Sequence, residues 1–397
     1  MISPRLFYFN ADFDFSLAGA VTEAHRRAVA ELSALLLPLG SARDRVLMPL
    51  ECKGEYTHFL ADNGIEIARA SPVGVNCEGF EGVPWGWDND AVEVLRRHGA
   101  RCVGPSVATV RNVNSRLFCY RLCKENNRGV PGARLCYTVD EVRMLLRTSL
   151  VPPFVIKPFF GSSGYGFIRK DTREPSENEI RQIQHAVKHG GVIVEPWLDR
   201  ILDISSRFVV KNGRVGSLRH QRMHANRAGA FYGNLLVPDD PVLAPWREQL
   251  DQAATLAAEA LGREGYFGPA GIDSFVYREN GGDKRLVAMN EINARIPMSA
   301  VAHALYGAVP EEYTAYFRFI GRRRHRLPDT YDSLHDLLGT LAFDRTTYTG
   351  VLPVTPLRVR RPDESWRRPS RTAFFVAGDS ERTVLSLDEA LRKALAP

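Results

Sequence analysis

The sequence contains 397 residues, carries a formal net charge of +6 and is 44% hydrophobic. This length exceeds what one hydrophobic core usually holds, so we expect about two to four packed units. No apolar run approaches the roughly 18 to 20 residues that span a bilayer, and residues Met1 to Asn10 lack the pattern of a signal peptide. These features argue against a helical membrane protein and predict a cytoplasmic protein with no membrane partner.

The first 110 residues alternate between predicted strands and predicted helices. A helix is indicated by the acidic start at Asp88 and by the glycine stop at Gly99. The predicted strands cover residues 5–10, 45–50, 65–69 and 100–106. Such alternation is typical of an open α/β domain with a largely parallel sheet.

The pattern changes after residue 110. We expect a helix over residues 114–127, a strand–glycine loop–strand unit, a helix over 177–190 and a strand over 191–198. Two hairpins follow, one turning at Asn212–Gly213 and one near Gly281–Gly282, and a long helix that ends at Gly262 lies between them. The last segment keeps helical and strand patterns, so we expect it to pack as an appendage. The predicted domains are therefore residues 1–110, 111–197, 198–320 and 321–397.

The six cysteines all lie between Cys52 and Cys136, and no two have the spacing of a CxxC pair. Cys119 and Cys123 fall on one face of a predicted helix, which suits packing better than bridging. We therefore expect reduced thiols and assign no zinc site.

Basic residues concentrate near the C-terminus, in Gly321–Arg326 and Arg358–Arg371. Such clusters can bind nucleic acid or an acidic protein, but more often they form a solvated face. We expect no nucleic-acid partner, and an acidic carrier protein stays open as the alternative to a solvated face.

A lysine lies in an apolar strand directly before a glycine-rich loop, within Phe154–Phe167. Alternation puts Val155 and Lys157 on one face of this strand, where the lysine needs an anionic partner. The loop has few Cβ atoms, so its N–H groups can close over phosphate oxygens, and its serines add hydroxyl donors. The alternative is a flexible hairpin with a lysine at its edge, because short glycine patterns are weak signals.

The second predicted hairpin carries acids that face one another. Period-2 alternation puts Glu291, Asn293 and Arg295 on one face, and the turn brings Asp273 nearly opposite Glu291. Two carboxylates and an amide oxygen placed together would repel unless a divalent cation joined them, and such hard oxygen ligands suit Mg²⁺ beside phosphates. A solvated polar strand face is the alternative.

Taken in order, these motifs resemble the ATP-grasp superfamily over about residues 105–305. The shared pattern is a lysine strand, a glycine-rich flap, an acidic hinge in "VEPWL" and a late Asp … Glu-x-Asn signature. The resemblance implies an ATP-grasp fold of mixed α/β and α+β class. Such a fold would hold an N-terminal open α/β lead-in domain, two subdomains that bind ATP with Mg²⁺ (Mn²⁺ as a substitute), and a small C-terminal appendage.

The resemblance also implies roles for individual residues. Lys157 corresponds to a phosphate-binding lysine, and Arg116 stands where many members carry a second one, which keeps the charge. Glu195 and Leu198 correspond to contacts with adenine, Asp203 to a ribose contact, and Arg295 to an arginine that faces substrate or transferred phosphate. The flap residues are Gly161, Ser162, Ser163, Gly164 and Gly166, and the metal ligands are Asp273, Glu291 and Asn293.

Two further segments are candidates for contact with substrate. In the resemblance, Arg219–Gly233 borders the γ-phosphate and the acyl substrate, which makes Arg222 and Arg227 candidate catalytic residues; a surface loop is the alternative. A metal pair of His220 and His224 is disfavoured because no third ligand is evident. After the first strand, Asp12 or Asp14 could bind an amine, or could cap the next helix, as we expect for at least one of them.

These observations predict an ATP-dependent ligase that activates a carboxylate as an acyl phosphate and joins it to an amine. Amino acids or small peptides are the expected substrates, and a homo-oligomer stays open. No nucleophile motif is present, which agrees with phosphoryl transfer by positioning and charge neutralisation. The alternatives are a carboxylate–thiol ligase that loads a carrier protein, and an ATP-binding interaction protein without turnover.

Overall fold

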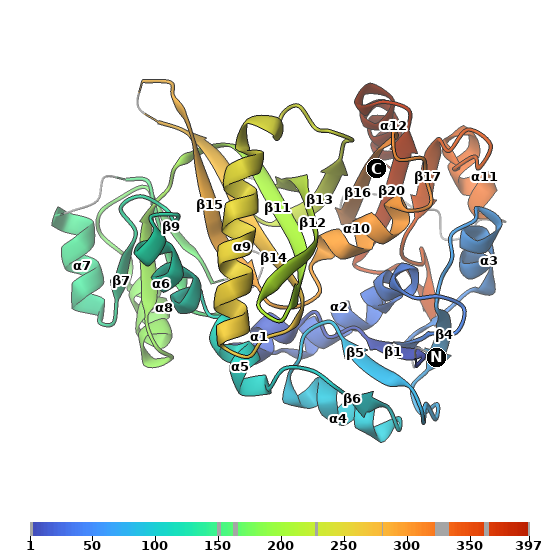
Figure 1. The fold of residues 1–397 in the computed structure, drawn as a ribbon, viewed down its shortest axis with the longest axis horizontal. Coiled ribbons are helices and arrows are strands. Elements are labelled where there is room, and N and C mark those ends of the chain that lie inside the picture. Colours follow the sequence, from blue (N-terminus) through green and yellow to red (C-terminus); the bar gives the residue numbers. More distant parts are fainter. Residues whose placement is uncertain are drawn as a thin grey trace.

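The computed structural model describes residues 3–148, 152–161, 166–226, 229–279, 281–321, 333–360 and 365–395. Within these residues the chain forms a parallel sheet, a small antiparallel sheet, a large antiparallel sheet and a three-stranded sheet that joins the ends of the chain (Figure 1). Ser162, Ser163, Gly164, Arg227 and most of the basic segment 321–326 lie outside the described residues. No helix in the described part of the chain is long and apolar enough to cross a bilayer.

The N-terminal domain is the predicted parallel α/β unit. Its five strands lie in the order β4-β2-β1-β5-β6 and are all parallel. They are β1 (Arg5–Tyr8), β2 (Arg45–Met48), β4 (Arg69–Pro72), β5 (Glu81–Pro84) and β6 (Arg101–Cys102). The helices of this region are α1 (Phe13–Leu17), α2 (Glu23–Leu32), the 3₁₀ helix η1 (Ser33–Leu39), α3 (Gly54–Asp62), α4 (Asn89–Arg97) and α5 (Val107–Val113). Strand β5 was not predicted, because its short run has no apolar alternation.

Helix α6 (Arg116–Asn126) leads into a four-stranded antiparallel sheet of order β7-β10-β8-β9. The strands are β7 (Arg134–Cys136), β8 (Phe154–Pro158), β9 (Ile168–Lys170) and β10 (Val192–Pro196), and the helices are α7 (Val139–Thr148) and α8 (Glu177–Lys188). Ile156 and Val194 pair in register and are buried in the core that α7 and α8 share with this sheet. Alternation therefore turns Val155, Lys157 and Glu195 to the opposite face.

The large sheet has eight strands in the order β15-β14-β11-β12-β13-β16-β20-β17. The predicted hairpins are β11 (Asp199–Lys211) with β12 (Arg214–Ala225), and β14 (Gly268–Arg278) with β15 (Lys284–Asn293). Both Asn212 and Gly213 have positive φ, as a two-residue type I′ turn requires. The remaining strands are β13 (Phe231–Leu236), β16 (Thr314–Gly321), β17 (Gly350–Pro353) and β20 (Arg371–Gly378).

Helix α9 (Arg247–Arg263) crosses one face of this sheet (Figure 1). Its buried side is made of small residues, including Ala253, Ala254, Ala257 and Ala258, so its backbone lies close to β11 and β12. At Gly262 a Cβ atom would come within 2.4 Å of the Gly213 Cα atom. The end of the helix thus rests directly on the β11–β12 turn, which explains why a glycine is needed there.

The C-terminal residues complete the large sheet instead of forming a separate lobe. Strands β20 and β17 continue it beyond β16, and the predicted boundary at residue 320 falls within β16. Short strands β3 (Glu51–Cys52), β18 (Val359–Arg360) and β19 (Trp366–Arg367) join this region to the N-terminal domain. The remaining helices are η2 (Ala244–Trp246), α10 (Met298–Tyr306), α11 (Leu334–Leu338), η4 (Gly339–Leu341) and α12 (Glu381–Ala394).

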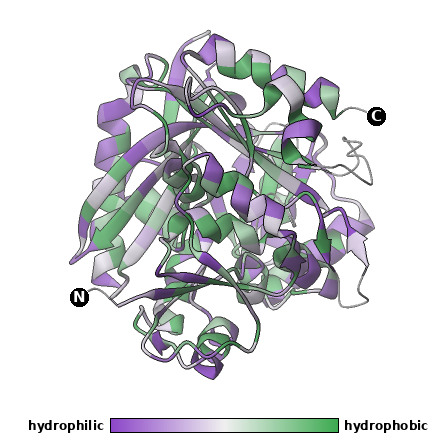
Figure 2. Cartoon of the chain, turned by 90° about the vertical axis from the view of Figure 1, so that its right-hand side faces the viewer, coloured by the Kyte–Doolittle hydropathy of each residue, from purple (hydrophilic) through white to green (hydrophobic). Residues whose placement is uncertain are grey.

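One hydrophobic core joins the two ends of the chain. It contains Phe7 and Leu35 from the N-terminal domain together with Phe374 and Val376 from β20. The helices of this side carry both hydrophobic and hydrophilic residues, as expected for helices with one buried face (Figure 2). The C-terminal segment is therefore part of the folded unit that holds the N-terminal domain against the large sheet.

This integration predicts a large effect of a single C-terminal core substitution. Phe375 is fully buried in β20, so Phe375→Ala should lower the free energy of unfolding by about 3–5 kcal/mol. Leu385→Ala in α12 is the control, because Leu385 is 40% exposed and its loss should cost less than about 1 kcal/mol. Urea denaturation of both variants measures the difference. Equal small losses would contradict an integral role for this segment.

Candidate active site

A cavity of about 510 Å³ lies where the N-terminal domain, the small antiparallel sheet and the large sheet meet. Its walls come from the residues that follow β1, from α1 and α2, from β8 and the start of β11, and from β12, β14 and β15. The predicted site residues that line it are Lys157, Gly161, Asp203, Asp273, Glu291, Asn293 and Arg295. The fold thus brings together residues that are up to 138 positions apart (157 to 295).

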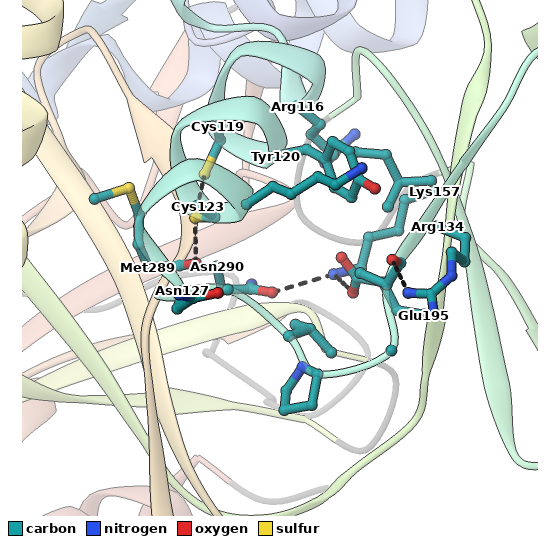
Figure 3. A pocket seen from close by; sticks show the side chains of 17 residues that line it. Arg116, Cys119, Tyr120, Cys123, Asn127, Arg134, Lys157, Glu195, Met289 and Asn290 are labelled. Atoms are coloured by element: carbon teal, nitrogen blue, oxygen red, sulfur yellow. Dashed lines mark hydrogen bonds and ion pairs between the residues drawn. The ribbon is translucent and has the colours of Figure 1, made fainter.

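Lys157 lies on the inner face of β8 and is only 3% exposed. Its Nζ atom lies 2.5 Å from a carboxylate oxygen of Glu195 and donates a hydrogen bond to the Asn290 Oδ1 atom at 3.2 Å (Figure 3). Burial lowers the pKa of Lys157, and the neighbouring Glu195 carboxylate opposes that shift. The anionic group that pairs with this lysine in the structure is therefore the Glu195 carboxylate.

A second cavity, of about 390 Å³, lies on the other side of the Lys157–Asn290 contact and is drawn in Figure 3. Both cavities are lined by Lys157 and Asn290, and the second one also contains Arg116 and Glu195. The Sγ atoms of Cys119 and Cys123 lie 3.9 Å apart in its wall, and both are free thiols as predicted.

Arg116 is the first residue of α6, where Ser115 caps the helix by accepting a hydrogen bond from the Phe118 N–H. The Arg116 side chain is 5% exposed and donates to the backbone carbonyls of Pro158 and Gly161. It also forms an ion pair of 2.8 Å with Glu291. One guanidinium therefore joins the start of the glycine-rich loop to the acids of β15.

The acids of the β14–β15 hairpin meet as the sequence predicts. Asp273 pairs directly with Glu291 across the two strands, and the Asn293 amide donates to an Asp273 carboxylate oxygen at 3.2 Å. Burial, with a smaller contribution from Glu291, raises the pKa of Asp273 from 3.8 to about 7. No three Asp, Glu, His or Cys side chains in the described ranges gather closely enough to hold a metal ion. A cation bound here would need oxygen atoms from another molecule as well.

Arg295 links this hairpin to the N-terminal domain. Its Nη2 atom lies 3.0 Å from an Asp14 carboxylate oxygen and also donates to the Asn293 Oδ1 atom at 2.9 Å. The guanidinium faces the ring of Trp85, with its central carbon 5.9 Å from the ring centre. The Asp14 carboxylate pairs with Arg295, and Asp12 accepts no side-chain hydrogen bond that would cap α1. The prediction that at least one of these two residues caps this helix is therefore wrong.

The predicted hinge contributes unequally to the main cavity. Asp203 lines it, and its nearest cation is Arg200 at 3.7 Å. Leu198 packs instead against the cluster of Phe275 and Tyr277. Phe167 and Trp197 also line the cavity, and the sequence analysis selected neither of them, although they lie in the flap and hinge motifs.

Asn290 lines the cavity, although the alternation of the strand predicts that it faces the other side from Glu291. The β14–β15 register shifts between the Asp273–Glu291 pair and the Phe275–Val287 pair, so β15 carries two extra residues at this point. Such a bulge breaks the alternation of faces and allows neighbouring residues to face one side. Asn290 and Glu291 consequently both line the main cavity.

Arg222 is a predicted catalytic residue that the structure places elsewhere. Residues Arg214–Ala225 form strand β12 and not a surface loop, and Met223 and Ala225 face the cavity. Arg222 faces the opposite side, where it pairs with Asp240 at 2.8 Å and with Glu381 at 2.5 Å. His220 bonds to Ser206 and Asp251, and His224 to the Tyr316 hydroxyl, so neither is arranged as a metal pair.

No protein-family sequence model matches the chain, and no curated protein sequence matches it either. Several solved structures match the chain in fold. A biotin carboxylase from Campylobacter jejuni is 12% identical, with a TM-score of 0.56 and coverage of 99% of this chain and 92% of that one. The biotin carboxylase domain of the Hydrogenobacter thermophilus 2-oxoglutarate carboxylase, solved with MgADP and bicarbonate, is 12% identical, with a TM-score of 0.52 and coverage of 95% and 86%.

The N5-carboxyaminoimidazole synthetase of Staphylococcus aureus, solved with ADP, is 11% identical, with a TM-score of 0.50 and coverage of 99% and 96%. These matches extend over nearly the whole chain and share its combination of a parallel N-terminal sheet with antiparallel sheets. The protein has the ATP-grasp fold. At these identities the likeness is one of fold, and the chemistry has to be argued from the cavity itself.

The raised pKa of Asp273 predicts how stability depends on pH without metal. Between pH 4 and 7 the folded protein keeps the Asp273 proton and the unfolded chain does not. The free energy of unfolding should therefore fall as pH rises through this range, by at most about 1.4 kcal/mol per pH unit from this group.

Denaturation in the presence of a chelator, compared between the wild type and Asp273→Asn, isolates this effect. The variant cannot lose the proton, so its stability relative to the wild type should grow from pH 5 to pH 8. Parallel pH profiles of the two proteins would contradict the assigned environment of Asp273.

Proposed function

We propose that this protein is an ATP-dependent ligase that activates a carboxylate as an acyl phosphate and joins it to an amine, with release of ADP and phosphate. The observation that carries this proposal is that buried Lys157 and the acids Asp273 and Glu291 line one cavity, and that Glu291 also pairs with Arg116. The cations suit phosphate, and the acids of the hairpin suit a divalent cation. One cavity therefore offers both halves of a site for metal-bound ATP.

The nucleotide would lie between the small sheet and the large one. In this proposal Lys157 and Arg116 bind the α- and β-phosphates, together with backbone N–H groups of the flap Gly161–Gly166 and the hydroxyls of Ser162 and Ser163. Phe167 and Trp197 offer ring faces to the base, and Asp203, which also pairs with Arg200, can accept from a ribose hydroxyl. Glu195, which lines the adjoining second cavity, and the backbone of Leu198 would contact the adenine amine.

The donor set fits Mg²⁺, with Mn²⁺ as a substitute. Asp273, Glu291 and Asn293 supply two carboxylates and an amide oxygen, and a divalent cation would favour the ionised form of the buried Asp273 carboxyl group, whose pKa is raised by burial. Mg²⁺ usually takes one or two carboxylates and completes its shell with phosphate oxygens and water. When bound, the ion would neutralise charge that develops on the β- and γ-phosphates.

The reaction follows from this layout. A carboxylate oxygen of the acid attacks the γ-phosphorus, the bond to the β–γ bridging oxygen breaks, and ADP leaves with the electron pair. The amine then attacks the acyl carbon and loses a proton, and phosphate leaves with the electrons of the carbon–oxygen bond. Arg295, next to Asn293, is positioned to hold the acyl oxygen and the transferred phosphate.

The cavity favours an organic acid over bicarbonate. One of the structurally similar carboxylases was solved with bicarbonate. Here the cavity continues past Arg295 to Phe9, Trp85 and Phe319, which are apolar and nearly buried. A bicarbonate ion would leave this apolar wall without contact, whereas a larger acid would cover it.

The direct test is ADP release from ATP with pooled amino acids, other carboxylic acids and amines, followed by mass spectrometry of the products. We expect ADP and phosphate to appear together with an amide. Tight ATP binding without turnover across the panel would contradict the ligase and favour an ATP-binding protein.

Lys157→Ala should weaken ATP binding by about 10- to 100-fold, because one charge-assisted contact to phosphate is lost. Lys170→Ala is the matched control, since Lys170 lies in the same sheet but pairs with Glu179 away from the cavity. Calorimetric titration with a non-hydrolysable ATP analogue measures both. Equal affinity of the two variants would exclude the phosphate role of Lys157.

Glu291→Gln should lower turnover by roughly 100-fold or more at saturating ATP, because it removes charge that the metal requires. Glu279→Gln is the control on the same hairpin, where Glu279 is exposed and pairs with Arg285. Turnover is compared together with melting temperature, which reports any loss from breaking the Arg116 pair. Near-normal turnover of Glu291→Gln would show that the metal assignment is wrong.

A further inference from the structure

The part of the main cavity beyond Arg295 is apolar and plays no role in binding the nucleotide or the metal. It is lined by Phe9, Val29, Leu32, Trp85, Met298 and Phe319. These side chains come from the N-terminal domain, from α10 and from β16, so the pocket exists only because the two ends of the chain share one core. Phe9, Trp85 and Phe319 are at most 8% exposed, which makes this wall largely preformed.

Two carboxylates, those of Asp12 and Asp14, line this part of the cavity, and only Asp14 pairs with a cation of the described residues. Asp14 accepts two hydrogen bonds from the Arg295 guanidinium, at 3.3 and 3.0 Å. Asp12 lines the same cavity but forms no ion pair with any described residue. Arg26 and His25 act on Asp12 only at longer range, and burial is the largest effect on its carboxyl group, raising its pKa. A carboxylate in such surroundings is stabilised by a cationic partner.

The cavity also offers a cation near these acids. Asp12 and Asp14 are two residues apart at the start of α1, and Asp14 touches Arg295. The Arg295 guanidinium keeps an N–H that Asp14 and Asn293 do not use. Asp12 and Arg295 line the same cavity, so a small molecule that carries both a carboxylate and an ammonium group, such as an amino acid, can pair with both.

We propose that the acid activated by this protein is an apolar amino acid, whose ammonium group pairs with Asp12 while its carboxylate faces Arg295 and its side chain covers the apolar wall. This inference rests on the proposed function, because it names the acid of that reaction. A charged side chain would lose its hydration against Phe9 and Trp85, whereas an apolar one would cover them. An acid that lacks the ammonium group would leave Asp12 unpaired.

Matched pairs of ligands test the ammonium contact. The full-length protein, loaded with Mg²⁺ and a non-hydrolysable ATP analogue, is titrated calorimetrically with phenylalanine and 3-phenylpropanoate, and with leucine and 4-methylpentanoate. We expect the amino acid of at least one pair to bind about tenfold or more tightly than its partner without the amine. Glutamate and lysine should bind more weakly than that amino acid.

Two variants assign the preference to Asp12. Asp12→Asn should bring the members of the preferred pair within about threefold of each other, because the charge contact is gone. Asp90→Asn should keep the wild-type preference, since Asp90 lies nearby on α4 and does not line the cavity. Equal binding within both wild-type pairs, absence of binding by all four apolar ligands, or tighter binding of glutamate or lysine would overturn the inference.

The same ligands separate this inference from the proposed function. With ATP and hydroxylamine, the preferred amino acid should yield its hydroxamate and ADP. Amino acid binding with the predicted preference but without ADP release would contradict the ligase and uphold the amino acid pocket. Hydroxamate formed equally well from the acids without an ammonium group would uphold the ligase and overturn the pocket.

Discussion

Arg116 and Glu291 meet at 2.8 Å between helix α6 and strand β15, and this contact joins the two cavities, because Arg116 lines the second one and Glu291 the main one. Arg116 is nearly buried, so it must be paired, and the same guanidinium also holds the carbonyls of Pro158 and Gly161. The ion pair therefore fixes the start of the flap relative to the acids of the β14–β15 hairpin. A nucleotide bound across this boundary would find its phosphate and metal contacts already at the correct separation.

The charges of the cavity are balanced without a ligand, but in a way that a ligand can rearrange. Lys157 is paired with Glu195 and Asn290, Arg116 with Glu291, and Arg295 with Asp14. Each cation thus has a protein carboxylate that a phosphate or a substrate carboxylate can replace. Asp273 is the exception, because it lies beside Glu291 and gains from a positive ion. This pattern explains how one site could accept a highly charged nucleotide and its metal together.

Local patterns in the sequence predict much of this site, and long-range packing explains the rest. The hairpin register that opposes Asp273 to Glu291 follows from strand alternation and a glycine turn, and Arg116 at the start of its helix follows from the Ser115 cap. The direction of the Arg222 side chain does not follow from local patterns. It depends on Asp240 and Glu381, which lie far from Arg222 in the sequence or on another element and pair with it on one face of β12. Asn290 was hidden by a bulge, and the Asp14–Arg295 contact joins residues 281 positions apart. The place of β20 beside β16 likewise depends on a core that both chain ends build.

The central claim is that a carboxylate oxygen attacks the γ-phosphorus within this cavity. This step can be tested with an acid whose carboxylate carries ¹⁸O. Mass spectrometry then follows the label through one turnover. The account predicts that one labelled oxygen moves to the released inorganic phosphate, because the acyl–oxygen bond breaks when the amine attacks. Label in AMP, with pyrophosphate as the other product, would show attack at the α-phosphorus and would contradict the account.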